Sequence, residues 1–217
     1  MQAIFLDAAG TLFDLAEPVG AVYARFADQH ELALTEKEAE FRFRKAFQSL
    51  PAPVYLDGQE GHESERQWWR DLVGVVVEGV EGERFEEFFE SLFAYYERPE
   101  AWRLFPETLS FLDRSKDRFR LAVVSNFDGR LHTILEGLAL CDYFELVVSS
   151  ADARARKPDE KIFQFALGKM NLSPSEVMQV GDSRKADYEG ALQMGLRAWH
   201  LQRGKGGDLL QVFEELD

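Results

Sequence analysis

Five short apolar runs, separated by segments of helical character, constrain the fold of this chain more than any other feature. The runs are QAIFL at 2–6, FRLAVVS at 119–125, FELVVSS at 144–150, EVMQVGD at 176–182 and LRAWHL at 196–201. The segments 128–138, 158–170 and 183–195 between the later runs have helical patterns. Alternation of buried strands with helices is typical of a parallel sheet covered on both faces. The sequence therefore predicts an α/β fold with a doubly wound parallel sheet, whose reactive groups gather at the carboxyl ends of the strands.

Residues 16–100 interrupt this alternation and show apolar positions at helical intervals instead. Phe85, Phe88, Phe89 and Leu92 form one such stripe, and a second begins at Trp68. Aromatic stripes of this kind usually pack a protein core, and we assign them that role. We therefore expect an all-helical cap over 16–100, inserted between the first and second strands of a core made of 1–15 and 101–217.

Charge and composition exclude several classes of partner. A formal net charge of −14 argues against nucleic acid, because polynucleotide affinity depends on clustered Lys and Arg. No run approaches the roughly 20 apolar residues of a membrane-spanning helix, and the first residues do not resemble a secretory signal. Cys141 is the only cysteine, which excludes an intramolecular disulfide and fits a reducing compartment; we expect it to be buried. We expect a cytoplasmic protein without a membrane partner, either a monomer or a homodimer.

Chemically useful residues follow four of the five runs, at the edge where parallel strands end. They are Asp7, Gly10 and Thr11 after the first run, Ser125 and Asn126 at the end of the second, Lys157 beyond the third, and Asp182 and Asp187 at the end of the fourth and just after it. Each signal alone is weak, but their order matches the expected topology. The fold should bring them to one place.

Three carboxylates in one pocket would raise one another's pKa unless a cation lay between them. Oxygen ligands with open positions for water and phosphate suit Mg²⁺. Asp7, Asp182 and Asp187 therefore predict a magnesium site, which would also neutralise an anionic substrate in this acidic protein.

These motifs, and most specifically VGDSRKADYEGALQMG at 180–195, resemble the haloacid dehalogenase-like hydrolase superfamily over essentially the whole chain. The cap position is similar to the subgroup with a helical cap between the first and second motifs. The tandem Trp68-Trp69 resembles a branch of that subgroup whose members are mostly regarded as phosphatases. The resemblance implies a Rossmann-like core and hydrolysis of a small phosphorylated metabolite.

The resemblance also implies roles for single residues. Asp7 would be nucleophile and metal ligand, and the backbone carbonyl of Ala9 would bind the metal. Asp182 would contact the metal directly, and Asp187 would mainly support it.

The remaining motif residues are expected to act on the phosphoryl group. Ser125 is suited to hydrogen-bond a phosphoryl oxygen, and Lys157 to neutralise charge and orient Asp7. Gly10, Thr11 and Asn126 are expected to contact the substrate.

Ala9 departs from the phosphatase pattern, in which an aspartate two residues after the nucleophile protonates the leaving alkoxide and then activates water. Loss of a general acid–base typically costs ~10²–10⁴-fold in rate. We favour a phosphatase in which water or a cap group such as Asp57, His62 or Glu63 replaces it, or in which the leaving group is stable as an anion.

Three alternatives remain open. A phosphate- and Mg²⁺-binding regulatory protein would need no acid at Ala9. DAAGT at 7–11 also resembles phosphonoacetaldehyde hydrolases, in which a cap lysine, here Lys45, would form a Schiff base. The same stretch resembles 2-haloacid dehalogenases, which work without metal, but Asp182 disfavours that reading because metal-free enzymes carry a neutral residue there.

Overall fold

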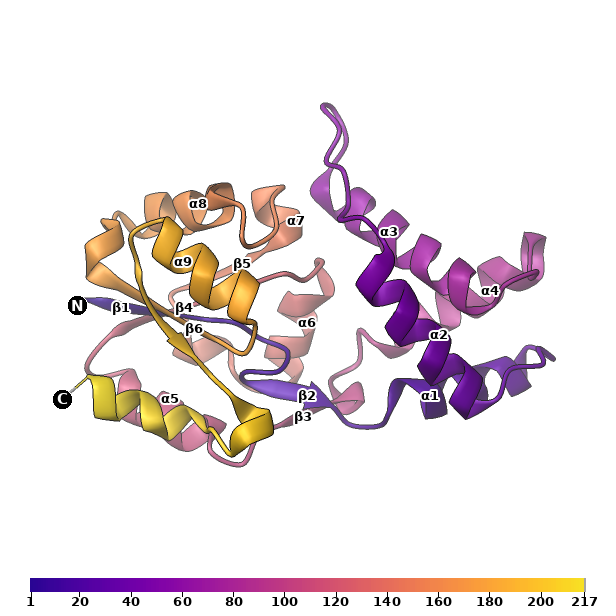
Figure 1. Cartoon of the computed structure of the whole chain (residues 1–217), viewed down its shortest axis with the longest axis horizontal. Helices are drawn as coiled ribbons and strands as arrows, with labels where there is room; N and C mark the ends of the chain where they lie inside the picture. The colour runs from indigo at the N-terminus through magenta and orange to yellow at the C-terminus, as the bar shows by residue number, and fades with distance from the viewer. Residues whose placement is uncertain (217) are drawn as a thin grey trace.

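The computed structural model describes residues 1–216, and its centre is a five-stranded sheet (Figure 1). The strands lie in the order β5-β4-β1-β6-β7, and every neighbouring pair is parallel. They are β1 (Ala3–Leu6), β4 (Arg120–Ser125), β5 (Leu146–Ser149), β6 (Val177–Gly181) and β7 (Arg197–His200). The chain builds outward from β1 to β5 and then returns to the other side of β1, so the strand order reverses beside β1. The predicted α/β doubly wound parallel sheet is confirmed.

Helices cover both faces of the sheet because successive side chains of each strand point to opposite sides. On β1, Phe5 packs in the cluster that contains α8 and α9, whereas Ile4 and Leu6 pack in the cluster with α5 and α6. All three side chains are completely buried. The covering helices are α5 (Thr108–Ser115), α6 (Arg130–Gly137), α7 (Ser150–Ala153), α8 (Glu160–Met170) and α9 (Gly190–Gln193).

The start of α8 fixes the segment that carries Lys157. Asp159 caps the helix, and its side chain accepts a hydrogen bond from the Lys161 N–H at 2.9 Å. Ile162 and Phe163 in the first turns are fully buried against the sheet. Cap and packing together hold the preceding loop at the carboxyl edge of the strands.

Four helices form a separate body beside the sheet, on the right in Figure 1. They are α1 (Val19–Gln29), α2 (Glu36–Ser49), α3 (Gly61–Val76) and α4 (Gly82–Tyr95), and we call them the helical insert. Their buried side chains form a cluster of their own, which includes the stripe Phe85, Phe88, Phe89 and Leu92. Both connections to the sheet run through a short antiparallel pair, β2 (Phe13–Leu15) and β3 (Trp102–Leu104), which the sequence pattern does not predict.

Three arginines of the sheet domain, Arg130, Arg154 and Arg156, bind the helical insert. Arg130 donates a hydrogen bond to the Phe93 carbonyl at 3.2 Å. Arg154 donates to the carbonyls of Gln59 and Leu56 at 2.8 and 2.7 Å. Arg156 Nε donates to the Glu65 carboxylate, with Oε1 at 3.0 Å. Glu65 is completely buried. These contacts join the helical insert to the sheet domain at the carboxyl edge.

The expectation that Cys141 is buried is wrong. The thiol lies exposed in the short helical turn Cys141–Tyr143 ahead of β5, at the surface. Within residues 1–216, no helix is long and apolar enough to cross a bilayer.

Candidate active site

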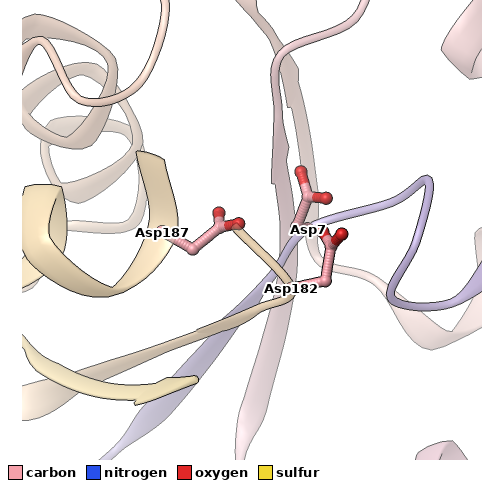
Figure 2. Close-up of side chains that lie close together, drawn as sticks. All are labelled: Asp7, Asp182 and Asp187. Atoms are coloured by element: carbon pink, nitrogen blue, oxygen red, sulfur yellow. The ribbon is translucent and has the colours of Figure 1, made fainter. Parts of the chain in front are cut away.

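Three carboxylates from separate parts of the chain converge at the carboxyl edge of the sheet (Figure 2). Asp7 directly follows β1, Asp182 directly follows β6, and Asp187 lies in the π-helical turn Arg184–Glu189. Each offers an oxygen within 4.8 Å of the others. Asp7 and Asp187 are buried, whereas Asp182 is exposed. The structure therefore brings together the three residues expected to hold a metal.

Sheet register explains the approach of Asp7 and Asp182. Leu6 pairs with Val180 in neighbouring parallel strands, so the residues after each strand leave the sheet side by side. Gly10 makes room for the loop between them: a Cβ there would lie 2.6 Å from Asp182 Oδ2, and its φ of +83° lies in the left-handed region that glycine favours.

Asp187 is held from two sides. Its Oδ2 accepts a hydrogen bond from the Ser183 N–H at 3.0 Å, and its Oδ1 accepts one from Gln179 Nε2 at 3.0 Å. Gln179 is completely buried on β6. These bonds fix the carboxylate in the orientation that Figure 2 shows, toward Asp7 and Asp182.

Lys157 inserts its ammonium among these groups. The Nζ atom donates to Asp7 Oδ1 at 2.7 Å, to Asp187 Oδ1 at 2.5 Å and to the Val124 carbonyl at 2.6 Å. Burial alone would lower the pKa of Lys157, but the carboxylates of Asp187 and Asp7 outweigh burial and raise it. The lysine therefore stays charged and orients Asp7.

One ammonium leaves two charges of the three carboxylates uncompensated. Partial removal of the Asp182 carboxyl from water, followed by repulsion from Asp7 and Asp187, raises the pKa of Asp182 to about 7. Burial also raises the pKa of Asp187, although Lys157 opposes the shift. An all-oxygen donor set with excess negative charge fits a hard divalent cation.

The residues at the end of β4 lie next to Lys157. Ser125 is 2% exposed at the end of the strand. The Asn126 side chain accepts a hydrogen bond from the Lys157 N–H at 2.7 Å and donates one to the Lys157 carbonyl at 2.9 Å. Both polar ends of the Asn126 side chain hold the backbone of Lys157, and Asn126 also lines a cavity beside the helical insert. Its contact with substrate stays a prediction.

The loop after β1 is supported by Arg203, which the sequence analysis did not single out. Its Nε and Nη2 donate to the carbonyls of Gly10 and Thr11 at 2.8 and 2.5 Å, and its Nη1 binds Glu107 at 2.8 Å. The Thr11 hydroxyl is buried and finds no hydrogen-bond partner among residues 1–216. Arg203 lies more than 190 residues along the chain from the loop, so no local pattern could reveal the contact.

A cavity of about 400 Å³ opens at Ala9, between the helical insert and the sheet. The three groups proposed as substitutes for the missing acid, Asp57, His62 and Glu63, are exposed and do not line it. His62 instead lies near Asp152, with 3.6 Å between Nε2 and Oδ1.

Lys45, the residue that a Schiff-base mechanism would require, is also exposed and outside the cavity lining. Phe43 and Phe47 line the cavity from α2, and Lys45, midway between them, projects from the opposite side of the helix. The structure therefore gives no support to the phosphonoacetaldehyde hydrolase reading.

Comparisons with known proteins find relatives of this chain in both sequence and fold. The sequence pattern of the haloacid dehalogenase-like hydrolases matches residues 1–195. The human haloacid dehalogenase-like hydrolase domain-containing protein 3 is 35% identical over 199 residues, which cover 89% of this chain and 78% of that protein. A phosphoserine phosphatase from Thermus thermophilus is 32% identical over 134 residues, covering 55% of this chain and 54% of its own length. The crystal structure of a HAD phosphatase from Thermococcus onnurineus superposes with a TM-score of 0.69 at 22% identity, covering 100% of this chain and 98% of the other.

Proposed function

This chain belongs to the haloacid dehalogenase-like hydrolase family, and from that premise we propose that it is a Mg²⁺-dependent phosphatase acting on a small phosphorylated metabolite through an aspartyl phosphate on Asp7. The observation that carries the proposal is the convergence of Asp7, Asp182 and Asp187 around the buried Lys157. Three carboxylates held close together repel one another, and this repulsion destabilises the fold. We therefore infer that the cluster is present for function and not for stability.

In the proposed reaction, Lys157 holds Asp7 Oδ1 at 2.7 Å and leaves the other carboxylate oxygen free to attack phosphorus. Ser125 would hydrogen-bond a phosphoryl oxygen, and the charge of Lys157 would neutralise the negative charge that develops on the phosphoryl group. When bound by Asp7, Asp182, the Ala9 carbonyl and, indirectly, Asp187, Mg²⁺ would supply the positive charge that holds phosphate beside a carboxylate. The helical insert would act as a cap that excludes water and selects the substrate.

A second candidate function follows from Ala9. A protein that binds phosphate and Mg²⁺ for regulation needs the acidic cluster and Lys157 but no group to move a proton at residue 9. Whether Asp7 becomes phosphorylated separates the two functions.

Incubation with acetyl phosphate and Mg²⁺ is expected to place one phosphate on the chain, at Asp7. Acetate leaves without needing a proton, so Ala9 does not impede this step. Intact-mass measurement and peptide mapping detect the modification, and EDTA should prevent it. Asp142→Asn, an exposed position ahead of β5, is the matched control and should be modified normally. An unmodified chain that nevertheless binds Mg²⁺ would favour the regulatory protein.

Magnesium is expected to stabilise the protein more at pH 8 than at pH 5.5. The pKa of Asp182, about 7 in the folded state, lies above its ordinary value of 3.8, so the folded ion-free protein holds a proton that the unfolded chain has released. The stability of the ion-free protein therefore falls as the pH rises from 3.8 to about 7. Above pH 7 the carboxyl of Asp182 has already lost its proton, so the cation binds without displacing it. At about 100 times its Kd, Mg²⁺ should raise Tm by roughly 5–10 °C at the higher pH.

Thermal unfolding with Mg²⁺ or EDTA at both pH values measures this difference. Asp182→Asn removes the titrating ligand and should abolish most of the rise in Tm that Mg²⁺ causes. Equal shifts at the two pH values would show that Asp182 does not compete with the ion for a proton.

A further inference from the structure

The cavity that opens at Ala9 is built mainly from aromatic and aliphatic side chains. Six aromatic rings line it, from α1, α3, α4, the residue after α4 and β3. They are those of Tyr23, Trp69, Phe89, Phe93, Tyr96 and Trp102. Its volume, about 400 Å³, lies in the usual range for small-molecule sites. A 150 Å³ apolar cavity already holds benzene, so this one accommodates one or two rings.

The two cations of the cavity wall are already neutralised. Arg130 binds Asp128 with two hydrogen bonds of 2.8 and 2.6 Å, and both side chains are buried. Arg156 binds the buried carboxylate of Glu65. Asp14 adds a negative charge to the lining. A carboxylate or second phosphate on the substrate would therefore find no spare positive charge in the cavity.

Arg130 also stiffens the aromatic wall. The guanidinium of Arg130 lies 3.8 Å from the centroid of the Phe93 ring and 5.5 Å from that of the Trp69 ring, and both rings line the cavity. The Tyr96 hydroxyl is buried in the wall and has no hydrogen-bond partner in the described chain. An uncharged ring that carries an acceptor oxygen matches these surroundings better than a sugar does.

Ala9 imposes a chemical requirement on the same ligand. Without an acid at residue 9, a leaving oxygen that is stable as an anion departs most readily. Phenol has a pKa of about 10, against about 15.7 for water, which an alkanol resembles, so phenolate is by far the better leaving group.

We propose that the substrate is an aryl phosphate monoester whose leaving group is an uncharged phenol of one or two rings, bound in this cavity. The inference deepens the proposed phosphatase function and rests on it. The Asp7 carboxylate forms a bond to phosphorus, the bond from phosphorus to the phenolic oxygen breaks, and phenolate leaves with the bonding electron pair. Water then attacks phosphorus, the bond to Asp7 breaks, and the proton that water loses ends on phosphate or on the phenolate in solution.

The second half of this reaction is the slow one. Departure of phenolate needs no proton, but attack by water benefits from a base, and residue 9 offers none. Phosphorylated Asp7 should therefore accumulate, so that about one phenol per chain is released in a burst before slow turnover.

Phenyl, cyclohexyl and acetyl phosphate separate the contributions of leaving group and cavity. Phenyl and cyclohexyl phosphate have similar size, but only the first releases a stabilised anion; acetyl phosphate releases a stabilised anion without a ring. With Mg²⁺ and rapid mixing, we expect the burst rate for phenyl phosphate to exceed the rate for cyclohexyl phosphate by roughly 10²-fold or more.

Phe47→Ala tests the cavity itself, since Phe47 lines it yet is 51% exposed on α2, so its loss should not unfold the protein. The ratio of kcat/KM for phenyl phosphate to that for acetyl phosphate should fall roughly two- to tenfold. Phe41→Ala, on the same helix, 69% exposed and outside the lining, is the matched control and should keep the ratio of the unaltered protein.

Each other outcome has a definite meaning. Equal rates with phenyl and cyclohexyl phosphate would overturn the leaving-group argument. Phosphorylation of Asp7 by acetyl but not by phenyl phosphate would overturn the aryl assignment and leave the phosphatase proposal intact. No phosphorylation by any of the three would overturn both. If Phe47→Ala leaves the ratio of kcat/KM for phenyl phosphate to that for acetyl phosphate unchanged, the phenyl ring does not bind in this cavity.

Discussion

Replacement of Asp7 by asparagine is expected to lower phosphatase turnover by roughly 10⁴-fold or more. The amide keeps the shape of the side chain but cannot supply a nucleophilic carboxylate oxygen to phosphorus. It also removes one of the two carboxylates that Lys157 contacts, at 2.7 Å. Steady-state release of phosphate from phenyl and acetyl phosphate measures the loss, and intact-mass measurement should find no phosphorylated protein.

The control for this prediction is again Asp142→Asn, which removes the same charge from an exposed turn ahead of β5. It should retain full activity. Substantial turnover by a folded Asp7→Asn protein, after exclusion of deamidation by peptide mapping, would mean that another group attacks phosphorus.

Replacement of Ala9 by aspartate is expected to accelerate hydrolysis of alkyl phosphates such as cyclohexyl phosphate by ~10²–10⁴-fold. Ala9 lines the cavity and lies two residues after Asp7, so we expect a carboxyl group added there to reach the leaving oxygen. It would protonate that oxygen and then accept a proton from water. Acceleration of the second step should also remove the burst seen with phenyl phosphate.

Ala9→Asn is the matched variant, because it has the same shape without a titrating group. A similar gain in both variants would indicate a polar or steric effect rather than proton transfer. No gain in Ala9→Asp, with Mg²⁺ binding intact, would indicate that a proton already reaches the leaving group by another route.

Much of the sheet could be predicted from the sequence because apolar runs and helical patterns are local signals. Once β1 and β6 are recognised, the rules for doubly wound sheets place Asp7 and Asp182 at the same edge, and the structure brings them together. Lys157 is placed by the same reasoning, since it lies between β5 and the start of α8. Sequence motifs that are weak signals one by one thus predict a cluster of side chains once the order of the strands is known.

The supporting contacts could not be predicted in this way. Arg203 and Glu65 act across 193 and 91 residues of sequence, where no periodic pattern links the partners. The expectation for Cys141 failed because its residue type favours burial, whereas its place in a turn exposes it. The cavity at Ala9 depends on how two separately packed bodies meet, and a single sequence contains no local signal for that.

The short ribbon of β2 and β3 has a mechanical consequence. Both chain crossings between the two bodies pass through it, and its strands are hydrogen-bonded to each other over Phe13–Leu15 and Trp102–Leu104. Because the two connecting strands are paired side by side, we expect the helical insert to rotate relative to the sheet about one axis that passes through β2 and β3. Such a rotation would have to break the hydrogen bonds by which Arg154 and Arg156 hold Leu56, Gln59 and Glu65.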